Sequence, residues 1–408
     1  MTAAAAPARM TKTRNWGWTA PLQWVIGIPN RMPVNAMKPL RSITLVAASL
    51  FAAPTFGQFT PGNLAVLRVG DGTPMISGAA AAVSIEQYSV LGEGQSPSYT
   101  VALPTTGASA ITLSGTAASE GALTRSADGM YLTFAGYNAD VGTLSVSSTT
   151  SAMVNRAVGV LDAAGAYSLP VKTANAFSGA SVCGAVTTDG AQFWITGNGN
   201  SGTGGVWAKS SSTETQVTSG NLRVVGVEGG NLLYSTGAGT VGLYAFSGLP
   251  TSADTASLLI KPASSFSNRA SPYDFALNPA GNVAYLADDR TFKADYTGGG
   301  IQRWEKIGST WSLTYSLNAG GTGGGSRGLV VDWSGANPVI FATTTELSAN
   351  RLIRIEDLGA GSSATTLAIA PANTLFRGVD FSPIPEPQTL TLLGLGGAGL
   401  FLRLRRRA

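Results

Sequence analysis

The chain has 408 residues, of which 44% are hydrophobic and 12% are charged, with 52 glycines, one cysteine and no histidine. The lack of histidine excludes Ser-His-Asp and Cys-His nucleophile pairs and imidazole metal sites. The lone Cys183 can neither close a disulfide within the chain nor build a thiolate zinc site, so we expect it to be a small buried residue. Any chemistry therefore falls to carboxylates, lysine, tyrosine and arginine.

Positive charge is concentrated at the two ends of the chain. The formal net charge is +4, but residues 1–57 carry six basic groups and no acidic one, and residues 384–408 carry four arginines and one glutamate. The remaining residues hold 16 basic and 21 acidic groups, a net charge of −5. Binding to phosphates needs several basic side chains on one face, so we expect no nucleic-acid partner.

The first predicted element is a secretory signal peptide over residues 37–57. A basic start is followed by an apolar run of eleven residues and by small residues that favour cleavage between Gly57 and Gln58. Met37 stands where the first residue of a signal peptide is expected, so residues 1–36 are interpreted as an over-extended, disordered start. The alternative is that the apolar run forms a buried helix.

The body, residues 58–383, has the pattern of many short strands. Its apolar segments are brief, rich in Val, Leu, Tyr, Phe and Trp, and separated by clusters of Gly, Asn, Asp, Ser and Thr. An all-β body is therefore predicted. The clearest strand-like segments are residues 63–69, 131–134, 192–196, 222–227, 232–235, 283–287 and 352–356.

A repeat within the body predicts a β-propeller. Each unit contains an apolar strand, a tight turn with Asp or Asn and Gly, and a second apolar strand. The turn glycines, which hairpins favour because they adopt positive φ at low cost, are Gly129, Gly190, Gly230, Gly281 and Gly335. Their intervals of 61, 40, 51 and 54 residues are typical of four-stranded propeller blades.

The last repeat ends near Pro383 without completing a blade, whereas strand-like segments at residues 64–69, 82–91 and 99–103 precede the first full repeat. Pairing of the C-terminal strand with these N-terminal strands would close the ring and leave no exposed sheet edge. Six four-stranded blades are therefore predicted, with seven blades or β-sandwich domains as alternatives.

Aspartates and tryptophans are the candidate functional residues of the body. Turn aspartates usually make local hydrogen bonds, although a carboxylate pair or a calcium site stays open as an alternative. Tryptophans could line a sugar-binding surface but are expected mainly in the core. We predict no catalytic residue, no metal site and no cofactor. The residues concerned are Asp128, Asp189, Asp274, Asp288, Asp289, Asp295, Asp332, Asp380, Trp194, Trp207, Trp304, Trp311 and Trp333.

The C-terminal tail, residues 384–408, combines three features. The tripeptide Pro385-Glu386-Pro387 is followed by an apolar, glycine-rich run over residues 390–402, which can insert as a short transmembrane helix. Four arginines end the tail and favour the cytoplasmic side of a membrane: Arg403, Arg405, Arg406 and Arg407. A permanent membrane anchor is the alternative interpretation.

This tail resembles the PEP-CTERM sorting signal of Gram-negative bacteria. The resemblance implies secretion, transient insertion into the inner membrane, processing by an exosortase and a final location at the cell surface or outside the cell. It also suggests a link with exopolysaccharide or biofilm. The functional hypothesis is a non-catalytic interaction protein, and the alternative is a secreted carboxylate- or calcium-dependent hydrolase or lyase that acts on polysaccharide.

Overall fold

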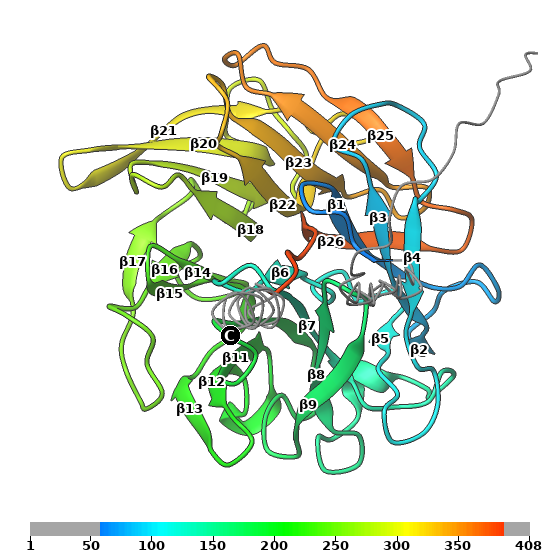
Figure 1. Ribbon diagram of the computed structural model, residues 1–408. Helices are drawn as coiled ribbons and strands as arrows, with labels where there is room; N and C mark the ends of the chain where they lie inside the picture. The colour runs from blue at the N-terminus through cyan, green and yellow to red at the C-terminus, as the bar shows by residue number, and fades with distance from the viewer. Residues whose placement is uncertain (1–57, 387–408) are drawn as a thin grey trace, which may run out of the picture. The chain divides into compact units, whose positions relative to one another are not determined.

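The computed structural model describes residues 58–386, which form six four-stranded antiparallel sheets arranged around a central axis (Figure 1). Each sheet is one blade of a β-propeller, and its strands run in sequence order from the centre outwards in the first five blades. The predicted all-β class and the predicted six blades are confirmed, and neither seven blades nor a sandwich is observed.

The strand bounds of the first three blades are as follows. Blade 1 contains β6 (Thr124–Arg125), β7 (Tyr131–Tyr137), β8 (Arg156–Asp162) and β9 (Tyr167–Thr173). Blade 2 contains β10 (Val182–Thr187), β11 (Phe193–Gly197), β12 (Gly205–Lys209) and β13 (Glu214–Thr218). Blade 3 contains β14 (Leu222–Glu228), β15 (Asn231–Thr236), β16 (Leu243–Ala245) and β17 (Ser257–Ile260).

The remaining blades complete the ring. Blade 4 contains β18 (Pro272–Leu277), β19 (Val283–Asp288), β20 (Gly300–Ile307) and β21 (Thr310–Leu317). Blade 5 contains β22 (Ser326–Asp332), β23 (Val339–Thr344), β24 (Arg351–Glu356) and β25 (Thr365–Ile369). Blade 6 contains β26 (Leu375–Phe381), β1 (Leu64–Val69), β3 (Val83–Tyr88) and β4 (Tyr99–Ala102). Two short 3₁₀ segments, η1 (Val146–Ser148) and η2 (Asn200–Gly202), lie in connections.

Blade 6 joins the two ends of the described chain. Its innermost strand β26 pairs antiparallel with β1, with Val379 opposite Val66, and β1 pairs with β3. One blade is therefore built from strands more than 300 residues apart in sequence. The predicted closure of the ring by N-terminal strands is confirmed.

Four of the five repeat glycines adopt the backbone conformation expected for tight turns. Gly129, Gly190, Gly230 and Gly281 have φ between 66° and 79°. Gly335 does not have a positive φ, so the expectation was wrong at this position. The connection there is longer, from Asp332 to Val339, and the Asp332 carboxylate turns the chain by accepting the Ser334 N–H at 2.9 Å.

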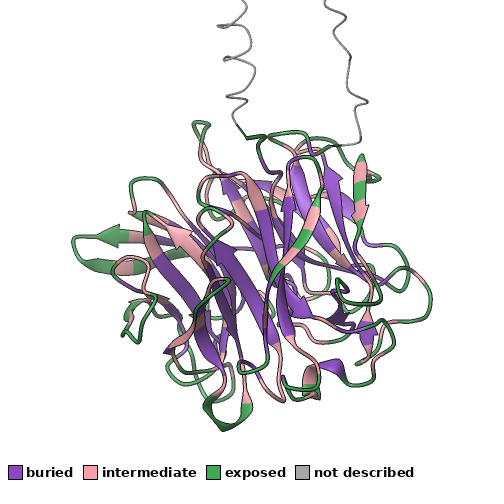
Figure 2. Ribbon diagram, turned by 60° about the horizontal axis from the view of Figure 1, so that its bottom comes forward, coloured by how far each residue is buried: buried purple, intermediate pink, exposed green. Residues whose placement is uncertain are grey.

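The core consists of the layers between neighbouring blades. One cluster of buried side chains includes Leu233, Tyr285 and Ile353, which come from three successive blades. Figure 2 shows buried residues along the strands and exposed residues at turns and along the outer rim. The alternation of the strands thus places apolar side chains between sheets, as propeller packing requires.

Polar links also tie each blade to the innermost strand of the next. Threonines from the second strands of blades 1, 2 and 5 donate to carbonyl oxygens on the following inner strand. Aspartates on β18 and β26 accept backbone N–H groups of the following inner strand, and an arginine on β14 donates to a carbonyl on β18. The side chains are Thr133, Thr196, Thr343, Asp274, Asp380 and Arg223.

One end of the central channel is covered by residues 115–122. This segment follows β5 (Leu113–Ser114), which pairs with β2 (Ala80–Ala81) in a two-stranded sheet. The Gly121 carbonyl accepts the Gly378 N–H of β26 at 2.9 Å, and the Ala122 N–H donates to the Cys183 carbonyl of β10 at 3.3 Å. The segment is therefore fixed across two inner strands.

Candidate ligand-binding cavity at the mouth of the channel

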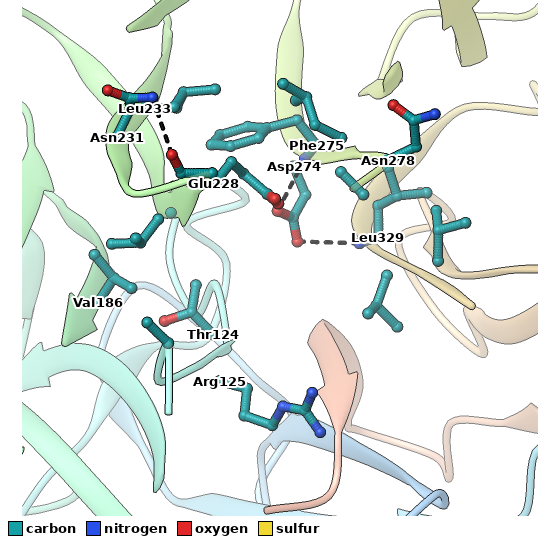
Figure 3. A pocket seen from close by; sticks show the side chains of 18 of the residues that line it. Thr124, Arg125, Val186, Glu228, Asn231, Leu233, Asp274, Phe275, Asn278 and Leu329 are labelled. Atoms are coloured by element: carbon teal, nitrogen blue, oxygen red, sulfur yellow. Dashed lines mark hydrogen bonds between the residues drawn. The ribbon is translucent and has the colours of Figure 1, made fainter. Parts of the chain in front are cut away.

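A cavity of about 720 Å³ opens at the end of the channel where the first and second strands of the blades are joined by turns. Its walls come from all six inner strands, β6, β10, β14, β18, β22 and β26, and it extends outwards to β21 (Figure 3). A volume of this size is within the range found for small-molecule sites. The fold thus provides a concave site where segments from six blades meet.

Aromatic rings form part of the cavity wall. Trp311 and Trp333 are both half-buried, and the Trp333 ring packs against Tyr285 with centroids 5.4 Å apart. Phe275 and Phe381 also line the cavity. Aromatic faces offer apolar contact area to a ligand while the tryptophan N–H groups can serve as donors.

Two aspartates in the cavity wall serve as ties between blades. Asp274 Oδ1 accepts its neighbouring Phe275 N–H at 2.9 Å, and Oδ2 accepts the Leu329 N–H of β22 at 3.0 Å (Figure 3). Asp380 repeats this arrangement: Oδ1 accepts the Phe381 N–H and Oδ2 accepts the Arg125 N–H, both at 2.6 Å. Both carboxyl groups are thus used by the backbone.

These two aspartates were expected in or beside turns, and this expectation was wrong. Asp274 lies within β18 and Asp380 within β26. Burial raises the pKa of both carboxyl groups. Charge repulsion from Asp380 and Glu228 raises the pKa of Asp274 further.

Glu228 is the third carboxyl group of the cavity, and only one backbone group, the Leu277 N–H of β18, acts on it. It stands at the end of β14, half-buried, and its side chain reaches towards Asp274 (Figure 3). Burial raises its pKa to about 8, although a hydrogen bond from the Leu277 backbone N–H lowers it, and the charge of Asp380 adds a smaller rise. At neutral pH this group is therefore mostly protonated and can donate a hydrogen bond to a ligand.

The cavity also contains cationic and amide side chains. Arg125 lies with its guanidinium carbon 5.9 Å from the centre of the Phe381 ring, and Lys306 is exposed at the rim. Within residues 58–386 neither of them forms an ion pair. Asn231 and Asn278 add amide groups. The site therefore combines aromatic surface with several hydrogen-bond donors.

The other predicted candidates are dispersed. Asp128, Asp189 and Asp332 accept backbone N–H groups two residues ahead, as expected for turn residues. The three neighbouring aspartates interact separately. Asp288 forms an ion pair with Arg290, and Asp289 forms one with Arg327. Asp295 accepts a hydrogen bond from the Thr297 N–H. In the described part of the chain, no three His, Cys, Asp or Glu residues are grouped to hold a metal ion.

The tryptophans divide between core and cavity. Trp194 and Trp304 are buried in the core and Trp207 packs against it, as expected, whereas Trp311 and Trp333 pack against the core and also line the cavity. Cys183 is a buried free thiol, and burial raises its pKa to about 12. Glu228 and Arg125 were not singled out from the sequence. The only sequence signal for Glu228 is its place before the Gly229-Gly230 turn.

The C-terminal segment leaves the propeller on the cavity side. The Ile384 N–H donates to the Gly129 carbonyl at 2.9 Å, and the Tyr131 hydroxyl donates to Glu386 Oε1 at 3.0 Å. Pro385 and Glu386 are exposed. The first residues of the sorting tripeptide are thus held against the turn that connects β6 and β7.

Several predicted elements lie outside the described residues. These are the signal peptide with Gly57, the apolar run 390–402, Pro387 and the terminal arginines Arg403, Arg405, Arg406 and Arg407. Gln58 is the first described residue and is exposed. Between residues 58 and 386 there is no helix with the length and hydrophobicity needed to cross a membrane.

Comparisons with known proteins identify the tail. Residues 383–407 match the PEP-CTERM protein-sorting motif, so the chain carries this signal as the sequence predicted. The motif implies export and sorting through the cell envelope, with processing by an exosortase. A comparison with curated proteins finds no match.

Solved structures similar to this chain include other propellers at low identity. TolB from Acinetobacter baumannii is 10% identical, with 80% of this chain and 68% of that chain covered and a TM-score of 0.48. A periplasmic gluconolactonase from Pseudomonas aeruginosa is 13% identical, with 76% and 83% covered and a TM-score of 0.40. A protein from Lactobacillus plantarum is 12% identical, with 78% and 99% covered and a TM-score of 0.40.

Proposed function

We propose that this protein is a non-catalytic binding protein of the cell surface or extracellular matrix, and that its cavity holds a saccharide unit of an exopolysaccharide. The precursor is inserted transiently into the inner membrane through its tail, is cleaved by an exosortase and is then released to the outside. The sorting motif supports the route, and the cavity supports the ligand class.

The observation that carries the proposal is the composition of the cavity wall. Trp311 and Trp333 offer flat apolar faces, and Glu228, Arg125 and Lys306 add hydrogen-bonding groups to the same cavity wall. A sugar ring has the same combination, because its C–H faces are apolar and its edge carries hydroxyl groups. Sites with an aromatic wall and a few directed polar groups are typical of small-molecule binding.

The carboxyl groups favour binding over hydrolysis. Hydrolysis of a glycosidic bond ordinarily needs two carboxyl groups on either side of the bond, one to donate a proton and one to act as base or nucleophile. Asp274 and Asp380 instead accept two backbone N–H groups each and join neighbouring blades. Among the cavity-lining residues, no other carboxyl group is therefore available to act on a glycosidic bond together with Glu228.

A secreted polysaccharide hydrolase or lyase is the second candidate, and one observation favours it. The pKa of Glu228 is raised to about 8, as is typical of a general acid, and this group lines the same cavity. If the protein is such an enzyme, Asp274 or Asp380 has to give up one of its hydrogen bonds to a backbone N–H in order to contact the substrate.

The two candidates are separated by a binding and turnover experiment. Oligosaccharides from the exopolysaccharide of the producing cells are titrated into the purified protein by calorimetry, and the same mixtures are followed by chromatography. We expect binding without new products. Trp333→Ala should weaken binding at least about tenfold, as expected for loss of an aromatic contact surface.

Trp207→Ala is the matched control, because Trp207 is also half-buried but packs against the core of blade 2, away from the cavity. Its binding constant should stay unchanged. Shortened products that depend on Glu228 would instead establish the enzyme. Absence of both binding and turnover would reject the saccharide proposal.

A further inference from the structure

A ring of aligned residues surrounds the channel on the side of the covering segment 115–122. Five inner strands, those of blades 2 to 6, each carry a β-bulge where two residues of the inner strand face one residue of the next strand. A bulge redirects the side chains beside it. The first residue of the bulge in each strand defines the ring: Cys183, Arg223, Tyr273, Arg327 and Arg377.

Three of the five ring residues are arginines, and two of them enclose Tyr273. The guanidinium carbon of Arg223 lies 4.1 Å from the centre of the Tyr273 ring, and that of Arg327 lies 5.6 Å from it. Arg327 also pairs with Asp289 at 3.2 Å. Arg223 donates only to neutral oxygens, those of Ser271 and Pro272. The ring therefore carries more positive than negative charge.

Arg377 is the least compensated of these arginines. Its side chain belongs to a residue only 5% exposed, and Nη2 donates to the Gly115 carbonyl at 3.0 Å. Its Nε is buried without a hydrogen-bond partner, and within residues 58–386 it forms no ion pair. A buried cation is ordinarily balanced by an anion because its desolvation is costly.

The nearby carboxyl groups do not form an ion pair with Arg377, and Glu120 acts on it only through its charge at longer range. Glu120 accepts hydrogen bonds from the Tyr137 hydroxyl at 2.6 Å and from the Ser114 N–H at 2.9 Å, and it does not pair with Arg377. Burial raises the pKa of Glu120 to about 7, so this group is partly protonated at neutral pH. Asp274, on the other side, accepts two backbone N–H groups.

A small cavity lies between these groups. It has a volume of about 20 Å³ and is lined by Tyr273, Arg327, Arg377, Glu120 and Asp274, among other residues. This volume suits one water molecule or one monoatomic ion and is too small for phosphate or sulfate. Burial, followed by the charge of Arg327, lowers the pKa of Arg377 to about 10, which is consistent with two cations close together.

We propose that this cavity is a binding site for a single halide ion, with chloride as the natural occupant, held between Arg327 and Arg377. The anion accepts hydrogen bonds from the guanidinium groups and neutralises their charge inside the channel. It thereby stabilises the contact of β22 and β26 with the covering segment. The site is separate from the large cavity, with which it shares only Asp274 in its lining.

Anomalous diffraction tests the proposal directly. Crystals of the purified protein are grown with sodium bromide in place of sodium chloride, and data are collected at the bromine edge. We expect one anomalous peak in the cavity between Arg327 and Arg377. A cavity that holds only a water molecule in bromide would overturn the proposal.

A measurement in solution covers the effect on stability. Melting is compared in sodium chloride and in sodium gluconate at equal ionic strength, because gluconate is too large for the cavity. Chloride should raise Tm by at least about 2 °C. Arg377→Gln and Arg327→Gln should each lose this difference, and a chloride effect that survives in both variants would contradict the site.

Arg351→Gln is the control, because Arg351 pairs with Glu346 at 2.9 Å in blade 5 and does not line the cavity. This variant should show the same difference in Tm between sodium chloride and sodium gluconate as the unchanged protein. If a ring variant does not fold, the bromide peak in the unchanged protein still decides the question.

Discussion

Asp274 and Asp380 use the same short side chain for the same purpose on two different blades. In each case one oxygen accepts the N–H of the following residue and the other accepts an N–H of the next inner strand. The inner strands converge at the channel, where side-chain space is limited. Each of the two oxygens of a carboxyl group can accept a hydrogen bond from one backbone N–H. In an amide side chain only the oxygen accepts, because the nitrogen is a donor.

Replacing Asp274 should destabilise the propeller. Asp274→Ala leaves the Phe275 and Leu329 N–H groups buried without partners, and each such group costs about 1 to 3 kcal/mol. We expect a loss of about 2 to 5 kcal/mol in the free energy of unfolding, measured with denaturant. Asp295→Ala, in an exposed loop, should change it far less. Equal stability of the two variants would contradict the role of Asp274 as a tie.

The raised pKa of Glu120 predicts that the free energy of unfolding decreases as the pH rises towards neutrality. Because burial raises its pKa in the folded state from 4.5 to about 7, the folded protein holds a proton there that the unfolded chain has released. Its contribution to stability is therefore complete below pH 4.5 and is lost as the pH rises towards 7 and beyond. The expected loss is about 3 kcal/mol.

The comparison of wild type with Glu120→Gln isolates this contribution. Other carboxyl groups with raised pKa, among them Glu228 and Asp274, act in the same direction in both proteins. We expect the free energy of unfolding to fall more steeply between pH 5 and pH 8 in the wild type than in the variant. Parallel pH profiles would show that Glu120 does not titrate in this way.

Among the structural elements, blade 6 shows what the sequence can predict. The segments 64–69, 82–91 and 99–103 were expected as strands, and β1, β3 and β4 lie within or close to them. The closure of the ring could be predicted by counting strands. The last repeat had too few strands for a blade, and the N-terminal strand segments belonged to no other repeat. The turn glycines followed from local φ preferences, and these held wherever the turn was tight.

The large cavity and the ring of arginines could not be predicted in the same way. Trp333 and Glu228 belong to different blades, and Arg223 and Arg377 are separated by more than 150 residues. Their meeting depends on the number of blades and on the bulges of the inner strands, which have no clear local signal. Arg327 and Arg377 stand next to glycines, but glycine is too common in this chain for that to be informative.

Removal of residues 58–103 should unfold the body rather than shorten it. This deletion removes β1, β3 and β4 and leaves β26 as the lone strand of blade 6, with its edge exposed. We expect the cooperative melting transition to disappear. Deletion of residues 387–408 is the control and should leave melting unchanged. A truncated protein that melts like the full body would refute the closure.

The contact between Tyr131 and Glu386 should slow processing of the tail. Only three residues separate the last residue of β26, Phe381, from Pro385, and the Tyr131 hydroxyl holds the motif glutamate. Tyr131→Phe should therefore be cleaved up to about fivefold faster, the equivalent of one hydrogen bond of about 1 kcal/mol.

Pulse-chase labelling in the producing cells gives the cleavage rate of Tyr131→Phe. Tyr296→Phe, a half-buried tyrosine far from the tail in sequence, is the control and should be cleaved at the wild-type rate. Slower cleavage of Tyr131→Phe would mean that this contact presents the motif to the enzyme instead of shielding it.

At the scale of the whole molecule, we propose that both ends of the chain are removed and that the propeller between them persists. Residues 37–57 and 384–408 are interpreted as temporary sorting segments, and the propeller between them is the lasting product. The excess of positive charge lies in residues 1–57 and 384–408, so residues 58–383 have a net charge of −5. This separation explains why the charge of the whole sequence is a poor guide to the partner of the mature protein.

The central claim is tested most directly by the intact mass of the protein from fractionated cells. We predict that the protein found outside the inner membrane begins at Gln58 and lacks residues 390–408, and that Glu386→Ala accumulates uncleaved in the inner membrane. A natural protein that stays in the inner membrane with its apolar run and terminal arginines still attached would contradict the account.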